Sequence, residues 1–233
     1  MDLKKGLSFF GVFSIASGAM ISSGIFILPG LAYSKAGPAV FISYFLAGVL
    51  ALLGIFSVIE LSTAMPKAGG DYFFINKTFG PMLGTISGLL GWFALSLKSA
   101  FAIFGISEIF FLYAGFNPLI SGLFLCLFFI IINLVGVKEA AIFQIAMIVV
   151  LLSLLSVYVV VGLPKVQASY FSPFLTVDIN EIFITSGFIF ISFGGLLKVA
   201  TVSEEVINPK RNIPLGMISS VIVVTTFYTL ITY

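Results

Sequence analysis

The chain lacks most of what a water-soluble protein needs on its surface. Only 9% of its 233 residues are charged, it has no histidine, and its single cysteine is Cys126. Soluble domains carry about 25% charged residues, so this composition cannot cover a surface that faces water. The missing histidines and the lone cysteine exclude a disulfide framework and remove the commonest general base and metal ligands. We therefore expect no metal site and no cofactor.

Positive charge is also sparse. The net charge is +2, and no group of lysines and arginines is larger than the pairs Lys4-Lys5 and Lys210-Arg211. This is too little to bind a nucleic-acid backbone, so we expect no nucleic-acid partner. The sequence also has no nucleophile elbow and no paired carboxylates within an apolar run, so we expect no enzyme.

Long apolar runs are abundant, because 60% of the residues are hydrophobic. About 20 apolar residues in a helix cross the hydrocarbon core of a bilayer. Seven runs approach or exceed this length: Leu7–Tyr33, Ala39–Thr63, Leu83–Tyr113, Leu119–Val135, Ala141–Leu163, Ile182–Val202 and Ile213–Tyr233. The pattern predicts an all-α integral membrane bundle of about seven transmembrane helices in one domain, residues 1–233, with the lipid bilayer as its surroundings.

The positive residues between the runs indicate the orientation, since lysine and arginine are enriched in cytoplasmic loops. With a cytoplasmic N-terminus, only Lys35 and Lys165 fall outside. The inside set is larger: Lys4, Lys5, Lys67, Lys77, Lys138, Lys210 and Arg211. We therefore predict a multi-pass protein of the cell membrane with its N-terminus in the cytoplasm.

Small and hydroxyl residues gather near the middle of the first and sixth runs. The first run holds Ser17, Gly18, Ser22, Ser23 and Gly24, and the sixth holds Ser192, Gly194 and Gly195. Glycine costs about 1 kcal/mol relative to alanine inside a helix, so both clusters favour a local break. A break is tolerated in a bilayer only where it faces a cavity or a ligand. The alternative is that both clusters are close-packing faces between helices.

Two broken helices would suit a small zwitterion. A half-helix that begins near Gly24 would present free N–H groups to a carboxylate. The half-helix that ends near Gly18–Met20, and the sixth run around Ser192–Gly194, would offer carbonyl groups to an ammonium. An amino acid or a related amine is the first substrate that these groups suggest, although any small zwitterion satisfies the argument.

Three motifs resemble the amino acid-polyamine-organocation (APC) family of permeases. They are GAMISSGIF at residues 18–26, ELSTAMPKAGGDY at 60–72 and EEVINPKRNIP at 204–214. The resemblance implies a LeuT-like architecture of two inverted five-helix repeats. It also implies secondary active transport of amino acids or related amines by alternating access, with a proton or sodium as possible coupling ions and with uniport, symport and exchange all open.

The resemblance assigns substrate contacts residue by residue. Ser23 and Gly24 would bind the substrate carboxylate, with Ser22 beside them, and the carbonyl groups of Met20 and Gly194 would receive the amino group.

Gate positions also follow from the resemblance. Ile191 stands where many members have an aromatic gate over the substrate, so Phe190 or Phe193 would take that role here. Glu60 lies near the inner end of its helix, where a carboxylate makes a cytoplasmic gate or a capping contact.

Lys98 lies near the middle of the third run, where a charge costs about 2.5–3.5 kcal/mol on insertion scales. Two functional interpretations are open: a fixed cation in place of a coupling sodium, or a titrating proton carrier. The structural alternatives are an ion pair or a side chain that reaches toward the membrane surface.

The length of the chain can be compared with that of two five-helix repeats. Residues 7–163 would form the first five-helix repeat, and residues 182–233 only the first two helices of the second. Two complete repeats need about ten spans. We therefore expect the transport function of the complete permease, with a truncated, non-transporting remnant or an accessory membrane subunit as the alternative for this chain alone.

Overall fold

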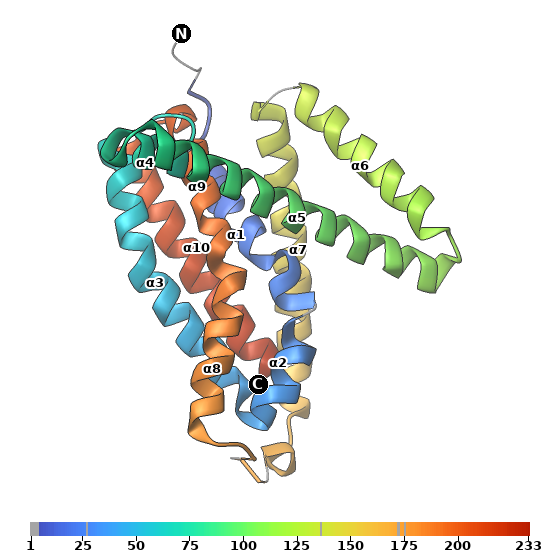
Figure 1. Ribbon diagram of the computed structural model, residues 1–233. Helices are drawn as coiled ribbons and strands as arrows, with labels where there is room; N and C mark the ends of the chain where they lie inside the picture. The colour runs from blue at the N-terminus through green and yellow to red at the C-terminus, as the bar shows by residue number, and fades with distance from the viewer. Residues whose placement is uncertain (1–4, 27, 136, 172, 175) are drawn as a thin grey trace. The chain divides into compact units, whose positions relative to one another are not determined.

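The computed structural model describes residues 5–26, 28–135, 137–171, 173–174 and 176–233 (Figure 1). Every named element in these residues is a helix, which confirms the all-α prediction. The chain divides into two compact units: residues 1–70 with 144–233, called here the first unit, and residues 71–143, called the second unit.

All seven predicted apolar runs are helical in the described residues. Five helical stretches are long and apolar enough to cross a membrane: Leu28–Ala64, Pro81–Ala114, Ala140–Lys165, Ile179–Thr201 and Pro209–Thr232. Two shorter apolar helices, Phe9–Ile21 and Pro118–Leu134, account for the other two runs. The chain is therefore a membrane helical bundle, as its composition predicts.

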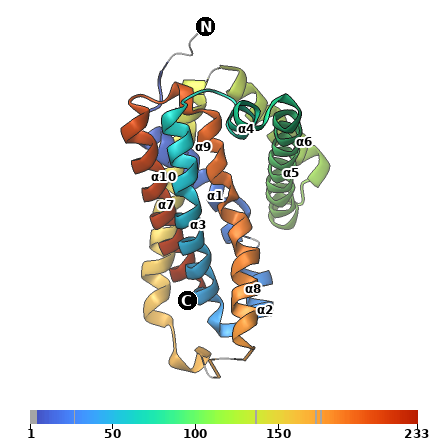
Figure 2. The same ribbon diagram turned by 60° about the vertical axis from the view of Figure 1, so that its left-hand side comes forward.

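The first unit combines helices from both ends of the chain. Its elements are α1 (Phe9–Phe26), α2 (Leu28–Ala36), η1 (Gly37–Ala39), α3 (Val40–Ala64), the later part of α7 (Val137–Gly162), η2 (Leu163–Lys165), η3 (Ala168–Phe171), α8 (Ile179–Phe190), η4 (Ile191–Leu196), α9 (Leu197–Thr201), η5 (Ser203–Glu205) and α10 (Pro209–Thr232). Figures 1 and 2 show the blue and cyan helices of the N-terminal part beside the orange and red helices of the C-terminal part. α10 packs on α1 and α3, α3 packs on α8, and α1 packs on η4.

Small residues let these helices approach closely. A Cβ atom at Gly216 of α10 would lie 2.6 Å from Val12 Cγ1 of α1, and one at Gly48 of α3 would lie 2.7 Å from Thr225 Cβ of α10. Both distances are shorter than real Cβ contacts, so only glycine fits. Dispersion contacts across such interfaces stabilise helix pairs in a bilayer, where apolar burial alone gives little gain.

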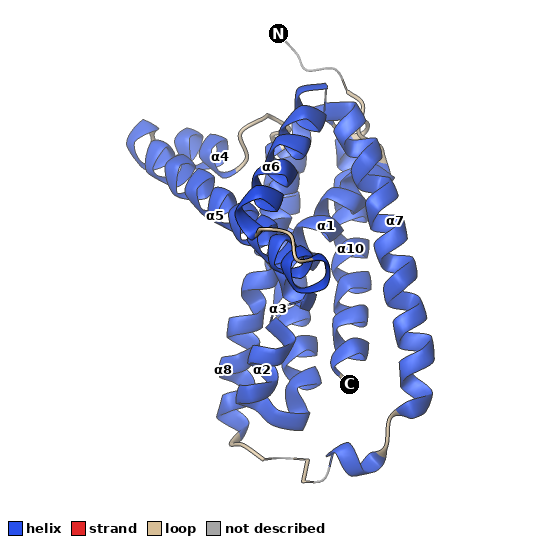
Figure 3. Ribbon diagram, turned by 90° about the vertical axis from the view of Figure 1, so that its right-hand side faces the viewer, coloured by secondary structure: helices blue, strands red, loops and turns tan. Residues whose placement is uncertain are grey.

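The second unit holds α4 (Asp71–Phe79), α5 (Pro81–Ala114), α6 (Pro118–Val135) and the first residues of α7, seen from another side in Figure 3. α5 ends at Gly115, whose φ of 69° is the left-handed conformation that glycine adopts at helix ends. Pro118 then begins α6 at the first helical position, where its missing N–H costs nothing.

The interruption predicted in the sixth run is present, but the one predicted in the first run is not where we expected it. The sixth run changes from α-helix to 3₁₀-helix over Ile191–Leu196 and returns to α-helix at Leu197. α1, in contrast, is continuous from Phe9 to Phe26 and includes Gly18, Met20 and Gly24. Residue 27, between α1 and α2, lies outside the described residues. The half-helix predicted to begin near Gly24 is therefore wrong.

The physical reason is that the glycines of α1 serve close packing. A Cβ at Gly18 would lie 2.8 Å from Gln144 Nε2, and one at Gly24 would lie 2.7 Å from Ser192 Cβ. Helix packing that requires glycine offsets the loss of about 1 kcal/mol in helix propensity. The contacts at Gly24 therefore fit the close-packing alternative.

Candidate functional site

The best candidate site surrounds Gly24, where α1, η4 and α10 meet. A Cβ at Gly24 would lie 2.7 Å from Ser192 Cβ and 2.9 Å from Tyr228 Cζ, and closer still to the Tyr228 hydroxyl. The two predicted clusters of small residues are therefore in direct contact, since Gly24 belongs to the first and Ser192 to the second.

Two tyrosine hydroxyls bind the last turns of α1. The Tyr228 hydroxyl donates to the Met20 carbonyl oxygen at 2.8 Å, and the Tyr44 hydroxyl donates to the Gly24 carbonyl oxygen at 3.1 Å. Both tyrosines are fully buried. The carbonyls at the end of a helix lack partners within the helix, so Tyr44 satisfies one of them. Near Gly24 the chain thus presents carbonyl acceptors that already have donors, rather than the free N–H groups that the sequence predicts.

Three aromatic rings form the wall of this site. The centroids of the Tyr44 and Tyr228 rings are 5.4 Å apart at an interplanar angle of 79°, and those of Phe193 and Tyr228 are 5.7 Å apart at 70°. These edge-to-face arrangements are the favoured geometry of aromatic pairs. The rings connect α3, α10 and η4, which fixes where each hydroxyl points.

η4 has a buried side and an exposed side. Ser192, Phe193 and Gly195 are buried, and the Ser192 hydroxyl donates to the Ile189 carbonyl oxygen at 2.7 Å. Ile191 is 69% exposed, and a Cβ at Gly194 would meet no atom within 4 Å. In a 3₁₀-helix residues three apart share a face, so Ile191 and Gly194 lie on the same side.

The structure brings some predicted site residues together and separates others. Met20, Gly24 and Phe193 meet in the buried cluster, whereas Phe190, Ile191 and Gly194 lie on exposed parts of α8 and η4. Ser22 and Ser23 belong to α1, but their side chains lie outside what the structure describes.

The other two candidates belong to other helices. Lys98 belongs to α5 in the second unit, whereas Met20 and Gly24 belong to the first unit, and Glu60 is an exposed residue of α3.

Sequence reasoning missed Tyr44 and Tyr228. Tyr44 is the only tyrosine in the second apolar run, and Tyr228 lies in the seventh. A buried tyrosine nearly always needs a partner for its hydroxyl, so a lone tyrosine in an apolar run is a signal that could have identified Tyr44. Its partner on α1 could not be predicted without the packing of the helices.

A second polar feature of the first unit is a loop cluster formed by residues 6–7, 67–68 and 203–207. Lys67 Nζ lies 3.0 Å from Glu204 Oε1, and the Ala68 N–H donates to Glu204 Oε2 at 3.0 Å. The Ala68 N–H and then Lys67 hold the pKa of Glu204 below its ordinary value. Burial, and secondly the neighbouring Glu204, raise the pKa of Glu205. The N–H groups of Gly6 and Leu7 donate to the Glu205 carbonyl oxygen at 2.9 and 3.0 Å, so the start of the chain joins the same cluster.

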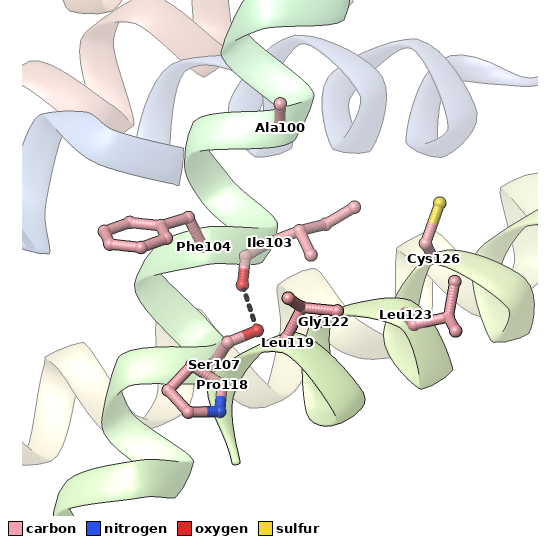
Figure 4. A pocket seen from close by; sticks show the side chains of 9 residues that line it. All are labelled: Ala100, Ile103, Phe104, Ser107, Pro118, Leu119, Gly122, Leu123 and Cys126. Carbon is pink, nitrogen blue, oxygen red and sulfur yellow. Dashed lines mark hydrogen bonds between the residues drawn. The ribbon is translucent and has the colours of Figure 1, made fainter.

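The second unit contains an apolar pocket of about 640 Å³ between α5 and α6 (Figure 4). Nine residues line it: Ala100, Ile103, Phe104, Ser107, Pro118, Leu119, Gly122, Leu123 and Cys126. The one hydroxyl among them, that of Ser107, already donates to the Ile103 carbonyl oxygen at 2.8 Å. This lining suits an apolar group and offers nothing to a zwitterion, so the pocket is not the candidate substrate site.

Comparison with known proteins identifies the family. The sequence model of the amino acid permease family matches residues 7–233. The chain belongs to the amino acid permease family. This family and the apolar helices together make it a multi-pass membrane protein.

Several curated proteins are similar to this permease chain. It is 30% identical to the methylthioribose transporter of Bacillus subtilis (strain 168), over 97% of this chain and 54% of that protein. It is 27% identical to cationic amino acid transporter 1 of Arabidopsis thaliana, over 98% of this chain and 42% of that protein. It is 26% identical to the serine/threonine exchanger SteT of Bacillus subtilis (strain 168), over 99% of this chain and 54% of that protein. The chain thus spans about half the length of these relatives.

Proposed function

We propose that this permease chain acts as a secondary active transporter that moves amino acids or related amines by alternating access. The observation that carries the proposal is the contact between Gly24 of α1 and Ser192 of η4. Substrate sites of inverted-repeat transporters lie where the interrupted helices of the two repeats meet. α1 and η4 belong to the first and sixth runs, which occupy corresponding places in two five-helix repeats.

The names of the relatives support the substrate class. They include a cationic amino acid transporter, a serine/threonine exchanger and a branched-chain amino acid permease. In the proposed site, Ser22 and Ser23 hold the substrate carboxylate, and the carbonyls of Met20 and Gly194 face the amino group. Phe193 is the preferred aromatic gate, because it is buried against Tyr228, whereas Phe190 and Ile191 are exposed.

The proposal also includes an orientation and a coupling ion. We place the chain in the cell membrane with a cytoplasmic N-terminus, following the distribution of positive charge. Lys98 lies within the helical stretch Pro81–Ala114 and is the candidate for proton coupling, or for a fixed charge in place of sodium.

Transport in proteoliposomes tests the function. The purified chain is reconstituted, and uptake and exchange of radiolabelled L-leucine, L-serine and L-arginine are measured with imposed pH or sodium gradients. We expect flux of at least one of them and its loss in Gly24→Leu, since that side chain would overlap Tyr228 and Ser192. Gly187→Leu on α8 is the matched control, because a Cβ there meets no atom within 4 Å. Absence of flux for all three amino acids, beyond that of empty liposomes, would overturn the proposal.

Lys98 has a test of its own in the same liposomes. If Lys98 carries the coupling proton, Lys98→Gln abolishes uptake driven by a pH gradient but keeps exchange of substrate across the membrane. If it is a fixed charge, Lys98→Arg retains uptake that Lys98→Gln loses. Equal uptake in wild type and both variants would remove Lys98 from the mechanism.

A further inference from the structure

The Tyr228 hydroxyl is hydrogen-bonded to the Met20 carbonyl, the same group that is proposed to bind the substrate's amino group. The Tyr228 hydroxyl lies 2.8 Å from the Met20 carbonyl oxygen, and both residues are fully buried. Met20 is one of the two residues whose carbonyl is proposed to receive the substrate's amino group. The same atom therefore has two candidate donors, one from α10 and one from the substrate.

The Met20 carbonyl oxygen has too few lone pairs to bind the Tyr228 hydroxyl and the substrate ammonium at the same time. A carbonyl oxygen accepts two hydrogen bonds. In an α-helix the N–H of each residue donates to the carbonyl four residues earlier, and α1 is continuous through Met20 and Gly24. The Gly24 N–H thus takes one lone pair of the Met20 carbonyl oxygen, and the Tyr228 hydroxyl takes the other. An ammonium group reaches this oxygen only if one of these two donors leaves.

The tyrosine hydroxyl is the donor that can leave. Releasing the Gly24 N–H would break a backbone hydrogen bond within α1, whereas the Tyr228 hydroxyl only has to turn about its Cζ–O bond. Ser192 is next to it, since a Cβ at Gly24 would lie within 3 Å of both the Ser192 Cβ and the Tyr228 Cζ. The Ser192 hydroxyl donates its hydrogen bond to the Ile189 carbonyl oxygen. The Ser192 oxygen can therefore accept a hydrogen bond from the Tyr228 hydroxyl once that hydroxyl has left Met20.

We propose that the Tyr228 hydroxyl takes the place of the substrate's amino group on the Met20 carbonyl, and that an incoming ammonium displaces it. Tyr228 is then a specificity residue that sets how strongly binding depends on the amine. The inference rests on the proposed amino acid site. Tyr44 supplies a contrast, because its hydroxyl binds the Gly24 carbonyl, which is not proposed to receive the amine.

Binding measurements on Tyr228→Phe test the inference. Radiolabelled L-leucine, L-serine and L-arginine are bound to the full chain in lipid nanodiscs, and the Kd of each amino acid that wild type binds is compared with that of the variant. Since the hydroxyl no longer competes with the ammonium for the Met20 carbonyl, Tyr228→Phe is expected to lower the Kd by up to about tenfold, the worth of one net hydrogen bond. A variant that merely loosened the site would raise it.

Two controls separate competition for the amine from a general effect on packing. The first is the deaminated analogue of the bound amino acid, which keeps its side chain and carboxylate. Tyr228→Phe is expected not to tighten binding of this analogue. The second is Tyr44→Phe, which removes another buried hydroxyl from α1. This variant is expected to leave the ratio of the Kd values for the analogue and the amino acid unchanged.

The outcomes distinguish the inference from the proposed function. If wild type binds none of the three amino acids, the proposed site is wrong and the inference falls with it. If wild type binds one and Tyr228→Phe does not bind it more tightly than wild type, the inference alone is overturned. If Tyr228→Phe does not fold, fluorotyrosine at position 228 of the otherwise unchanged chain decides. Its fluorine NMR signal must shift on addition of the amino acid and not on addition of the deaminated analogue, and a signal that does not move overturns the inference.

Discussion

Lys67 and Glu204 join two loops that are 137 residues apart in the chain, with Lys67 Nζ 3.0 Å from Glu204 Oε1. The second carboxylate oxygen accepts the Ala68 N–H at 3.0 Å, and the Ser203 hydroxyl donates to the Lys67 carbonyl oxygen at 3.2 Å. One carboxylate thus ties the loop after α3 to the loop before α10. Because Gly6 and Leu7 bind the Glu205 carbonyl, the approach to α1 is held by the same loop.

Glu204 should make the stability of this permease fall at low pH. Its folded pKa lies below the ordinary value of 4.5, because the Ala68 N–H and Lys67 favour the ionised form. The contribution is therefore complete above about pH 4.5 and is lost as the pH falls through the folded pKa. Glu204→Gln is expected to lower the apparent Tm near neutral pH and to flatten the acid part of the curve. Thermal unfolding of wild type and Glu204→Gln in detergent, from neutral pH to below pH 4.5, checks this prediction. A shift in apparent Tm that is the same at every pH would contradict it.

Glu205 should act with the opposite sign. Burial, and secondly the charge of Glu204, raise the pKa of Glu205, so its ionised form weakens the folded state. Its stabilising contribution is complete below the ordinary pKa of 4.5 and is lost as the pH rises through the folded value. Glu205→Gln is expected to raise the apparent Tm at neutral pH, where Glu204→Gln lowers it. Equal effects of the two substitutions would show that loss of any negative charge in this loop has the same result.

Gly195 should tolerate no side chain, although its neighbour Gly194 does. A Cβ at Gly195 would lie 2.6 Å from Ala19 Cβ and closer still to the Ala19 carbonyl, which is backbone and cannot turn aside. Gly195→Ala is expected to destabilise the protein by about 1–3 kcal/mol or more, the usual cost of overpacking. Gly194→Ala is the matched control in the same 3₁₀-helix, because a Cβ there meets no atom within 4 Å.

The unfolding of the two variants decides this prediction. Apparent Tm values of wild type, Gly194→Ala and Gly195→Ala are compared in one detergent. A similar loss in both variants would mean that η4 requires glycine for its backbone conformation rather than for the contact with α1.

The apolar helices could be predicted from the sequence because hydropathy is a local property. All seven apolar runs are helical, and Gly194 and Gly195 of the sixth run lie in η4. Whether a glycine cluster breaks a helix or packs it depends on what lies opposite, and that is not local. Gly24 stays helical because Ser192 and Tyr228, from distant parts of the chain, fill the space beside it.

The same distinction explains which site residues were found. Met20 and Gly24 belong to the GAMISSGIF motif, which can be recognised in the sequence. Tyr44 and Tyr228 gain their roles only from the way α3 and α10 pack against α1. Which side of η4 is buried could not be predicted either, since it depends on how η4 packs against α1. Ile191 and Gly194 are therefore exposed together, while Phe193 is buried between them.

The interface between α3 and α10 should respond to one substitution and recover with a second. A Cβ at Gly48 would lie 2.7 Å from Thr225 Cβ, with the Thr225 methyl and hydroxyl closer still. Gly48→Ala is therefore expected to cost about 1–3 kcal/mol. Thr225 Oγ1 is buried and, within the described residues, has no hydrogen-bond partner, so Thr225→Ala loses no such bond and vacates the space.

A double-mutant cycle measures this compensation. Residues in contact commonly show interaction energies of about 0.5–3 kcal/mol, and here the sign should favour the double variant, which regains most of what Gly48→Ala loses. Thermal unfolding of wild type, both single variants and the double variant supplies the four values. Additive losses would show that Gly48 is required for the backbone of α3 and not for the approach of α10, because removal of the Thr225 side chain would then bring no relief.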